Sequence, residues 1–210
     1  MNDRRRQVVL GAAALVIQPA LAKQLIPTPQ QMAGPFYPPE PPLEDDSDLT
    51  RVRGRSTVAQ GRITDLSGRV LDPDGRPVAN ARVEIWQCDA LGFYHHPKDR
   101  AGDRDPGFQG FGASVTDGDG RYRFRTIRPV AYPGRTPHIH FAVFTPGASP
   151  FVTQLYVAGD ARNERDFLFK AIPTERRRLV LAEFLPARGS RAELAAGFDI
   201  VLGRNGTPAG

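Results

Sequence analysis

Short apolar segments separated by tight turns constrain this chain more than any other feature of its sequence. Residues 72–75 (Asp-Pro-Asp-Gly) form a turn sequence, because proline presets φ and glycine readily adopts positive φ. A second turn sequence at 116–120 (Thr-Asp-Gly-Asp-Gly) leads into residues 122–124, whose alternation predicts a half-buried strand in a hairpin with 113–115. The 210 residues include 20 prolines and 21 glycines. Together these features predict an all-β chain folded as an antiparallel β-sandwich.

Strand patterns continue along the chain from residue 58 to residue 203. They lie near 83–85, 138–144, 154–157, 179–184 and 197–202, and residues 160–169 are compatible with one or two helical turns. We therefore expect one sandwich domain over 58–203, followed by a flexible tail at 204–210.

Residues 1–22 have the pattern of a signal peptide. A basic start precedes a short apolar stretch at 8–17, which is too short to span a bilayer, and small residues at 20–22 suit cleavage. Arg5 and Arg6, followed by an apolar run, fit a twin-arginine signal, and an ordinary secretory signal is the alternative. We expect export to the periplasm or beyond the cell, and no membrane span in the mature chain.

Residues 23–57 are expected to form an arm rather than a packed unit. The segment 35–42 is rich in proline, which fixes φ, cannot donate strand hydrogen bonds and so favours an extended path. A flexible linker is the simplest interpretation. However, Phe36 and Tyr37 are costly to leave in water, so we expect the arm to lie over the sandwich or over a partner chain.

Charge and cysteine content exclude some classes of protein. The net charge of +5 comes from scattered basic residues, and the densest internal run, 176–178, has Glu175 before it and Glu183 soon after. Such a run indicates a solvated face rather than a nucleic-acid surface. Cys88 is the one cysteine, so no disulfide forms within the chain, and it is expected to be a small buried side chain.

Two histidines and two tyrosines suggest a metal site. In an extended strand His138 and His140 project from the same face and could share one ion, although two ordinary polar positions are the alternative. Tyr132 precedes them, and a segment after an upstream strand supplies Tyr94. Tyrosinate is a hard anionic ligand, so this set of two nitrogens and two oxygens favours Fe(III) over Zn(II).

The sequence resembles the intradiol ring-cleavage dioxygenases at several motifs that occur in the same order. They are Gly-Arg-Pro-Val-Ala-Asn-Ala (75–81), Val-Glu-Ile-Trp-Gln (83–87), Gly-Phe-Tyr (92–94), Thr-Asp-Gly-Asp-Gly (116–120), Arg-Pro (128–129), Tyr-Pro (132–133) and His-Ile-His (138–140). The segment 33–37 (Ala-Gly-Pro-Phe-Tyr) resembles the amino-terminal arm of the protocatechuate branch, which lines the active site. The resemblance therefore implies the intradiol dioxygenase type of sandwich, nearest to the protocatechuate 3,4-dioxygenase-like branch.

The same resemblance implies the roles of individual residues. Tyr94, Tyr132, His138 and His140 would hold Fe(III), and the ring of a catecholic substrate would be cleaved by O2 between its two hydroxyl-bearing carbons to a muconate-type diacid. Tyr132 would also take a proton from the substrate. Arg135 would stabilise negative charge on the ring, and Gln154 falls near the O2 side. His95 and His96 are expected to be surface or supporting residues.

Other functions remain open at this point. A transthyretin-like or carbohydrate-binding module would share the sandwich without needing the four ligands. A zinc or copper site could instead use His95, His96, His138 and His140. The connection from Tyr132 to His138 is shorter than in the protocatechuate enzymes, so the catechol that is cleaved cannot be inferred. Assembly as a homo-oligomer or a hetero-oligomer is equally open.

Overall fold

The computed structural model describes residues 24–40, 42, 44–99 and 102–203. The expected signal peptide at 1–22 and the expected tail at 204–210 lie outside these residues. Within the described ranges no helix has the length and apolar character needed to cross a membrane.

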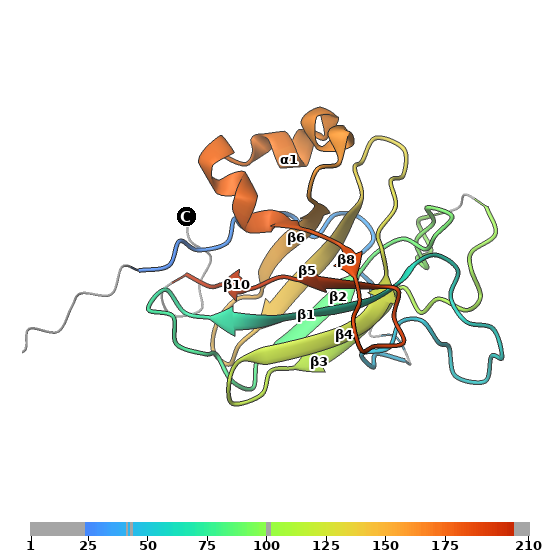
Figure 1. The fold of residues 1–210 in the computed structure, drawn as a ribbon, viewed down its shortest axis with the longest axis horizontal. Coiled ribbons are helices and arrows are strands. Elements are labelled where there is room, and N and C mark those ends of the chain that lie inside the picture. Colours follow the sequence, from blue (N-terminus) through green and yellow to red (C-terminus); the bar gives the residue numbers. More distant parts are fainter. Residues whose placement is uncertain (1–23, 41, 43, 100–101, 204–210) are drawn as a thin grey trace, which may run out of the picture.

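Two five-stranded sheets form the molecule, as the sequence predicted for an all-β sandwich (Figure 1). The first contains β1 (Ile63–Leu71), β4 (Arg121–Ile127), β8 (Leu185–Pro186), β9 (Leu194–Gly197) and β10 (Ile200–Val201). The second has the order β3 (Phe111–Val115), β2 (Arg82–Trp86), β5 (His138–Phe144), β6 (Phe151–Val157) and β7 (Leu181–Ala182).

Strand pairing corrects two details of the prediction. The sheets are mixed rather than purely antiparallel, because β1 runs parallel to β9 and β10 and β6 runs parallel to β7. The predicted hairpin of 113–115 with 122–124 is also wrong, since β3 pairs with β2 and β4 pairs with β1. The turn at 116–120 therefore connects the two sheets. Alternation reports which side chains face a core, but not which neighbour completes the hydrogen-bond ladder.

The central strand β5 is covered on both faces. Its alternate residues Ile139, Phe141 and Val143 are buried in the main core between the sheets. The other face of β5 carries His138 and His140, which are also buried. A strand in the middle of a sheet, with both neighbours hydrogen-bonded, holds its side chains in fixed positions. The main core thus fixes the position of β5 through one face, and the other face presents His138 and His140 in fixed positions.

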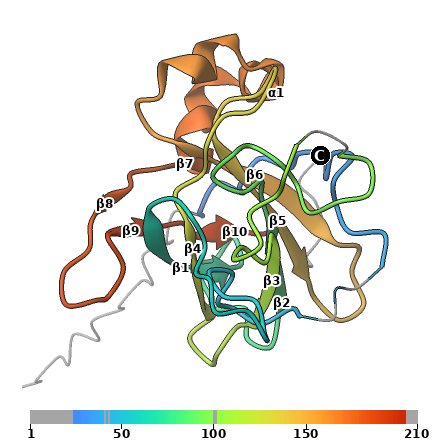
Figure 2. The same ribbon diagram turned by 90° about the vertical axis from the view of Figure 1, so that its right-hand side faces the viewer.

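The first part of the arm, 24–40, covers that second face, whereas Leu49 in its later part is buried in the main core. Backbone hydrogen bonds join Thr28 N to Val201 O at 2.9 Å and Gln31 N to Val152 O at 2.8 Å, so the arm passes beside β6 (Figure 2). Phe36 and Tyr37 pack against a small cluster that includes Trp86. Cys88 belongs to the same cluster, and burial raises the pKa of its thiol to about 12.

Short helices fill the connection between β6 and β7. They are the 3-10 helix η1 (Ala161–Arg165), α1 (Phe167–Ala171) and the 3-10 helix η2 (Thr174–Val180). The first two agree with the helical turns expected at 160–169. The strand expected at 179–184 is reduced to β7, because the chain is still helical as far as Val180.

Candidate functional site

His138 and His140 point to one place on the outer face of β5. Their Nε2 atoms are 3.2 Å apart, and their rings lie 4.8 Å apart between centroids. Each side chain is almost fully buried, with 1% and 2% of the residue surface exposed. The alternative of two ordinary polar positions facing solvent is therefore wrong. Two buried imidazoles this close need either a shared proton or a shared ion.

The surroundings keep both imidazoles neutral. Nδ1 of His138 lies 2.6 Å from the carbonyl oxygen of Thr136, which can only accept, so Nδ1 carries the proton and Nε2 offers a lone pair. Burial, and then the positive charge of Arg135, lowers the pKa of His138 to about 4. Burial also lowers the pKa of His140 well below its usual value. Neutral imidazole is the form that binds a metal.

A tight turn places Tyr132 next to His138. Arg135 N donates to the carbonyl oxygen of Tyr132 at 2.9 Å, and Gly134 has a φ of 82°. Proline followed by a glycine with positive φ is the sequence of a type II turn, so residues 132–135 determine this geometry locally. The ring centroids of Tyr132 and His138 are 5.5 Å apart. The turn thus carries Tyr132 and Arg135 to the same side as the histidines.

Tyr94 reaches the site from the loop that follows β2. Its backbone N donates to Asp99 Oδ2 at 2.7 Å, and the buried carboxylate of Asp89 accepts from the backbone of Leu91 and Phe93, which shapes the loop. The Tyr94 ring lies 5.5 Å from that of Tyr132 and 6.2 Å from that of His140. Among the described residues its buried phenol oxygen has no hydrogen-bond partner.

These four side chains fit a metal better than they fit a dry core. Burial, and next the neighbouring Tyr132, raises the pKa of Tyr94 well above its usual value, and burial raises the pKa of Tyr132. Both phenols are therefore neutral without a cation, whereas a trivalent ion would stabilise their phenolates. An unpartnered phenol and two facing imidazole nitrogens are three polar groups that one ion would satisfy.

Arg135 and Gln154 both lie beside the four donors. Gln154 is the residue of β6 directly opposite His140. The Arg135 guanidinium donates from Nη2 to Gln154 Oε1 at 2.6 Å, and only 9% of its side chain is exposed. The structure thus brings together all six site residues that the sequence suggested.

His95 and His96 do not join this group. His95 Nε2 lies 3.7 Å from Asp89 Oδ2, and its ring meets the edge of Phe108. His96 is buried, and its Nδ1 accepts from the backbone of Lys98 at 3.1 Å. In the described part of the chain no three His, Cys, Asp or Glu side chains form a group able to hold a metal. The zinc or copper alternative built on four histidines therefore has no site there.

The sequence reasoning missed several residues that pack around the site. Trp86 stacks on His140 with centroids 4.8 Å apart and planes at 6°. Phe36, by contrast, belongs to the arm segment that was expected to line the site, and it stacks on Tyr94 at 4.4 Å. Tyr156 lies opposite His138 on β6 and donates to Gln31 Oε1 at 2.5 Å. The cross-strand pairs Trp86–His140 and His138–Tyr156 follow from the register of β2, β5 and β6, which sequence spacing does not provide.

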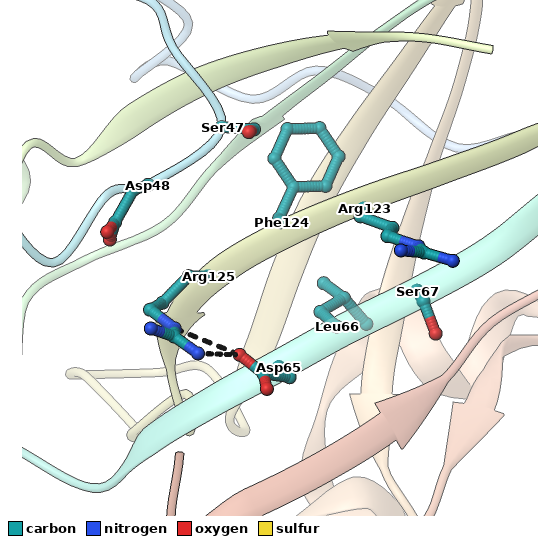
Figure 3. Close-up of a pocket in the computed structure, with 8 residues that line it drawn as sticks. All are labelled: Ser47, Asp48, Asp65, Leu66, Ser67, Arg123, Phe124 and Arg125. Atoms are coloured by element: carbon teal, nitrogen blue, oxygen red, sulfur yellow. Dashed lines mark hydrogen bonds and ion pairs between the residues drawn. The ribbon is translucent and has the colours of Figure 1, made fainter. Parts of the chain in front are cut away.

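Hollows on the described surface lie over both sheets, and two of them show the contrast between the sheets. One, of about 520 Å³, borders Trp86 and Tyr94 and is walled by Phe36, Phe111 and several prolines. The other lies along β1 and β4 and is lined by Ser47, Asp48, Asp65, Leu66, Ser67, Arg123, Phe124 and Arg125 (Figure 3). In the second hollow Arg125 and Asp65 form an ion pair at 2.9 Å, so these charges are satisfied within the protein. Only the first of the two borders the residues described above.

The family model and two relatives that match this chain are all described as dioxygenases. The model of a family described as "Dioxygenase" matches residues 32–204. The protocatechuate 3,4-dioxygenase beta chain of Burkholderia cepacia is 42% identical over 144 residues, which are 63% of this chain and 61% of that protein. A catechol 1,2-dioxygenase of Candida albicans is 33% identical over 149 residues, 62% of this chain and 47% of that protein. The chain thus spans less than two thirds of the length of either relative.

One solved structure is similar to this chain over almost the whole length of the solved domain. The dioxygenase domain of a dioxygenase and carbohydrate-binding protein fusion from Streptomyces sp. SirexAA-E has a TM-score of 0.63 and 31% identity. The match covers 85% of this chain and 99% of that domain. The range 32–204 that the family model matches spans the sandwich and the part of the arm that starts at Met32.

Proposed function

Because the chain belongs to the intradiol ring-cleavage dioxygenase family, we propose that it is a non-haem Fe(III) enzyme that cleaves catecholic rings with O2. The bond broken would join the two hydroxyl-bearing carbons, and the product would be a muconate-type diacid. The observation that carries this proposal is the convergence of two neutral imidazoles and two phenols on one buried point. The donors come from β5 and from two separate loops, so residues that are far apart in the sequence meet only in the folded chain.

Tyr94, Tyr132, His138 and His140 would hold the iron. When bound, Fe(III) would favour ionised phenols, accept both oxygens of the substrate diolate as ligands and make the ring reactive toward O2. His138 and His140 supply neutral nitrogen donors from a rigid strand. Trp86 and Phe36 exclude water from one side of the site, because they stack directly on His140 and Tyr94.

Tyr132 is suited to accept a proton from the substrate. Its phenol is only partly buried and lies in a turn rather than on a strand, so its ring can move without disturbing the sheet. Because burial raises its pKa, Tyr132 Oη keeps a proton once it has received one away from the metal.

Arg135 supplies fixed positive charge without donating a proton. A guanidinium stays protonated at any physiological pH, so its role at this site is electrostatic. It lies close enough to Tyr132 to oppose part of the rise that burial causes in the pKa of that phenol. Held in place by Gln154, the same charge can stabilise an anionic ring as negative charge develops.

Iron-loaded protein is expected to be red-brown and to consume O2 with at least one of catechol, hydroxyquinol and protocatechuate. The colour follows from charge transfer between tyrosinate and ferric iron, which zinc cannot produce. Visible spectroscopy and an oxygen electrode measure the two properties on the same sample, and zinc-loaded protein is the control. A colourless iron-loaded protein that consumes no O2 with any of the three would favour a binding module over an enzyme.

Iron binding is also expected to quench the fluorescence of Trp86 by more than half. Trp86 is the one tryptophan of the chain, and its stacking on His140 puts it within a few ångströms of the proposed metal. Titration of metal-free protein with ferric iron, followed by tryptophan emission, tests this without any turnover. His140→Ala is the matched control, since it removes the stacked ligand and should leave emission nearly constant. Equal quenching in that variant would place the iron elsewhere.

A further inference from the structure

One buried carboxylate holds the backbone and side-chain groups around Arg135. Asp166 Oδ2 accepts from Arg135 Nε at 2.8 Å and from the backbone N of Thr136 at 3.0 Å. Its Oδ1 accepts from the backbone N of Leu168 and of Phe169, both at 3.0 Å, as the cap of α1. The side chain of Asp166 is 0% exposed. Four donors therefore fix this carboxylate, and one of them is the guanidinium.

The Arg135 side chain is held from three directions. Asp166 binds Nε and Gln154 binds Nη2, so two nitrogens of the guanidinium are each held by a separate side chain. The ring of Phe167, the residue after Asp166, lies 5.7 Å from the guanidinium carbon. Gln154 is itself fixed, because its Nε2 donates to the carbonyl oxygen of Met32 in the arm at 3.2 Å.

We propose that Asp166 is a positioning residue that aims the Arg135 guanidinium at the bound substrate. This inference rests on the proposed function, since it assigns a role in that reaction to a residue that touches neither substrate nor metal. An arginine has four rotatable side-chain bonds, and one hydrogen bond to Gln154 would leave most of that freedom. The second, charged bond at Nε fixes both the position and the plane of the guanidinium.

The charges agree with this role. Although burial alone would raise it, the backbone N–H groups of Phe169 and Thr136 and the guanidinium of Arg135 lower the pKa of Asp166, so the carboxylate is ionised. An ionised pair inside the protein adds no net charge to the site. Asp166 therefore orients the Arg135 guanidinium and does not add to the positive charge that a substrate would meet.

The simpler interpretation is that Asp166 only caps a short helix. Asp160 provides a matched comparison in the same connection, because it caps η1 by accepting from the backbone N of Arg162 at 3.0 Å and also pairs with the Arg162 side chain. The Arg162 side chain is 57% exposed, and within the described residues its hydrogen bonds and ion pair go to Asp160. The two aspartates thus share a helix cap and an arginine partner, but the Asp160 side chain binds the nearby Arg162, whereas Asp166 also binds Thr136 and holds an arginine of the site.

Asp166→Asn is expected to lower kcat by about 10²-fold in iron-loaded protein, the size of effect that a misplaced catalytic group produces. Iron content and visible absorption should stay at wild-type values, because no donor to the metal changes. Asp160→Asn should keep kcat within about 2-fold of wild type. Asp166→Glu retains the charge and should recover part of the lost rate, and it also provides a folded variant if Asp166→Asn does not fold.

A double-mutant cycle separates positioning from general damage. If Asp166 acts through Arg135, then Asp166→Asn should cost no more than about 2-fold in kcat once Arg135→Met is present. Additive losses, or a full-rate Asp166→Asn single variant, would overturn the proposal.

A second measurement does not depend on turnover. In the 15N–1H spectrum of metal-free protein, the Arg135 Nε–H signal should be protected from solvent exchange in the wild type and in Asp160→Asn, and exposed in Asp166→Asn. If the wild type cleaves no catechol but the signal behaves this way, the proposed function fails while Asp166 still holds Arg135. An equally protected signal in Asp166→Asn would refute the positioning role itself.

Discussion

Tyr132→Phe is expected to abolish or shift the visible absorption of the iron-loaded protein and to lower the rate of ring cleavage by about 10³-fold. The change removes one oxygen that would serve both as a metal donor and as the acceptor of a substrate proton, and general base catalysis alone is worth about 10² to 10⁴. The fold should be unaffected, because Tyr132 lies in a turn and is only partly buried. Visible spectra and oxygen uptake on protein of equal iron content measure both effects.

Tyr37→Phe is the matched control for this experiment. Tyr37 packs on Trp86 with centroids 4.9 Å apart, and its hydroxyl donates to Glu84 at 2.8 Å, so it is a neighbouring tyrosine outside the four donors. Its replacement should leave the absorption band unchanged. An unaltered band in Tyr132→Phe, or an equal loss in both variants, would contradict the assignment of Tyr132 as a ligand.

Gly68→Ala is expected to destabilise the protein by about 3 kcal/mol, at the upper end of what overpacking usually costs. Gly68 lies in β1 where the backbone of Phe198 passes closely, and an added Cβ would be 1.8 Å from the Phe198 carbonyl oxygen. The same oxygen accepts a hydrogen bond from the buried hydroxyl of Tyr122, so a shift of Phe198 would also disturb that bond. Urea unfolding followed by circular dichroism gives the change in the free energy of unfolding.

Gly118→Ala tests whether the effect is specific to that close approach. Gly118 lies in the exposed turn between β3 and β4, and a Cβ there would meet nothing within 4 Å. Its substitution should change the free energy of unfolding by no more than about 0.5 kcal/mol. Similar stabilities for Gly68→Ala and wild type would show that β1 and Phe198 can move apart at little cost.

The chemistry of the site could be predicted from sequence because its residue types are rare and locally arranged. His138 and His140 share a strand face through the two-residue period, and the turn at 132–135 carries its own geometric signal in proline and glycine. Tyr94 entered the donor set as a tyrosine that follows an upstream strand, and the resemblance to a family then implied its role. No local rule joins it to Tyr132, which lies 38 positions later in the sequence.

Asp166 could not be found in this way. Its cap of α1 is visible in sequence as an aspartate before an apolar helical turn, but its bond to Arg135 spans 31 residues and depends on how the helical connection folds back over β5. The prediction of a hairpin around the turn at 116–120 was wrong for a related reason. Each strand of a sandwich can pair within either sheet, and only the whole set of strands decides which pairing buries the most surface.

The arm and the rest of the chain make separate contributions to the site. The arm contributes the carbonyl oxygen of Met32, the Gln31 side chain and the rings of Phe36 and Tyr37 to the surroundings of the site, yet none of the four proposed metal donors. The carbon atom of a side chain at Gly34 would come within 3.5 Å of His140, so a single substitution in the arm could reshape the wall of the site. A substitution in the arm would therefore alter the wall of the site while the four proposed metal donors, which all lie outside the arm, keep their places.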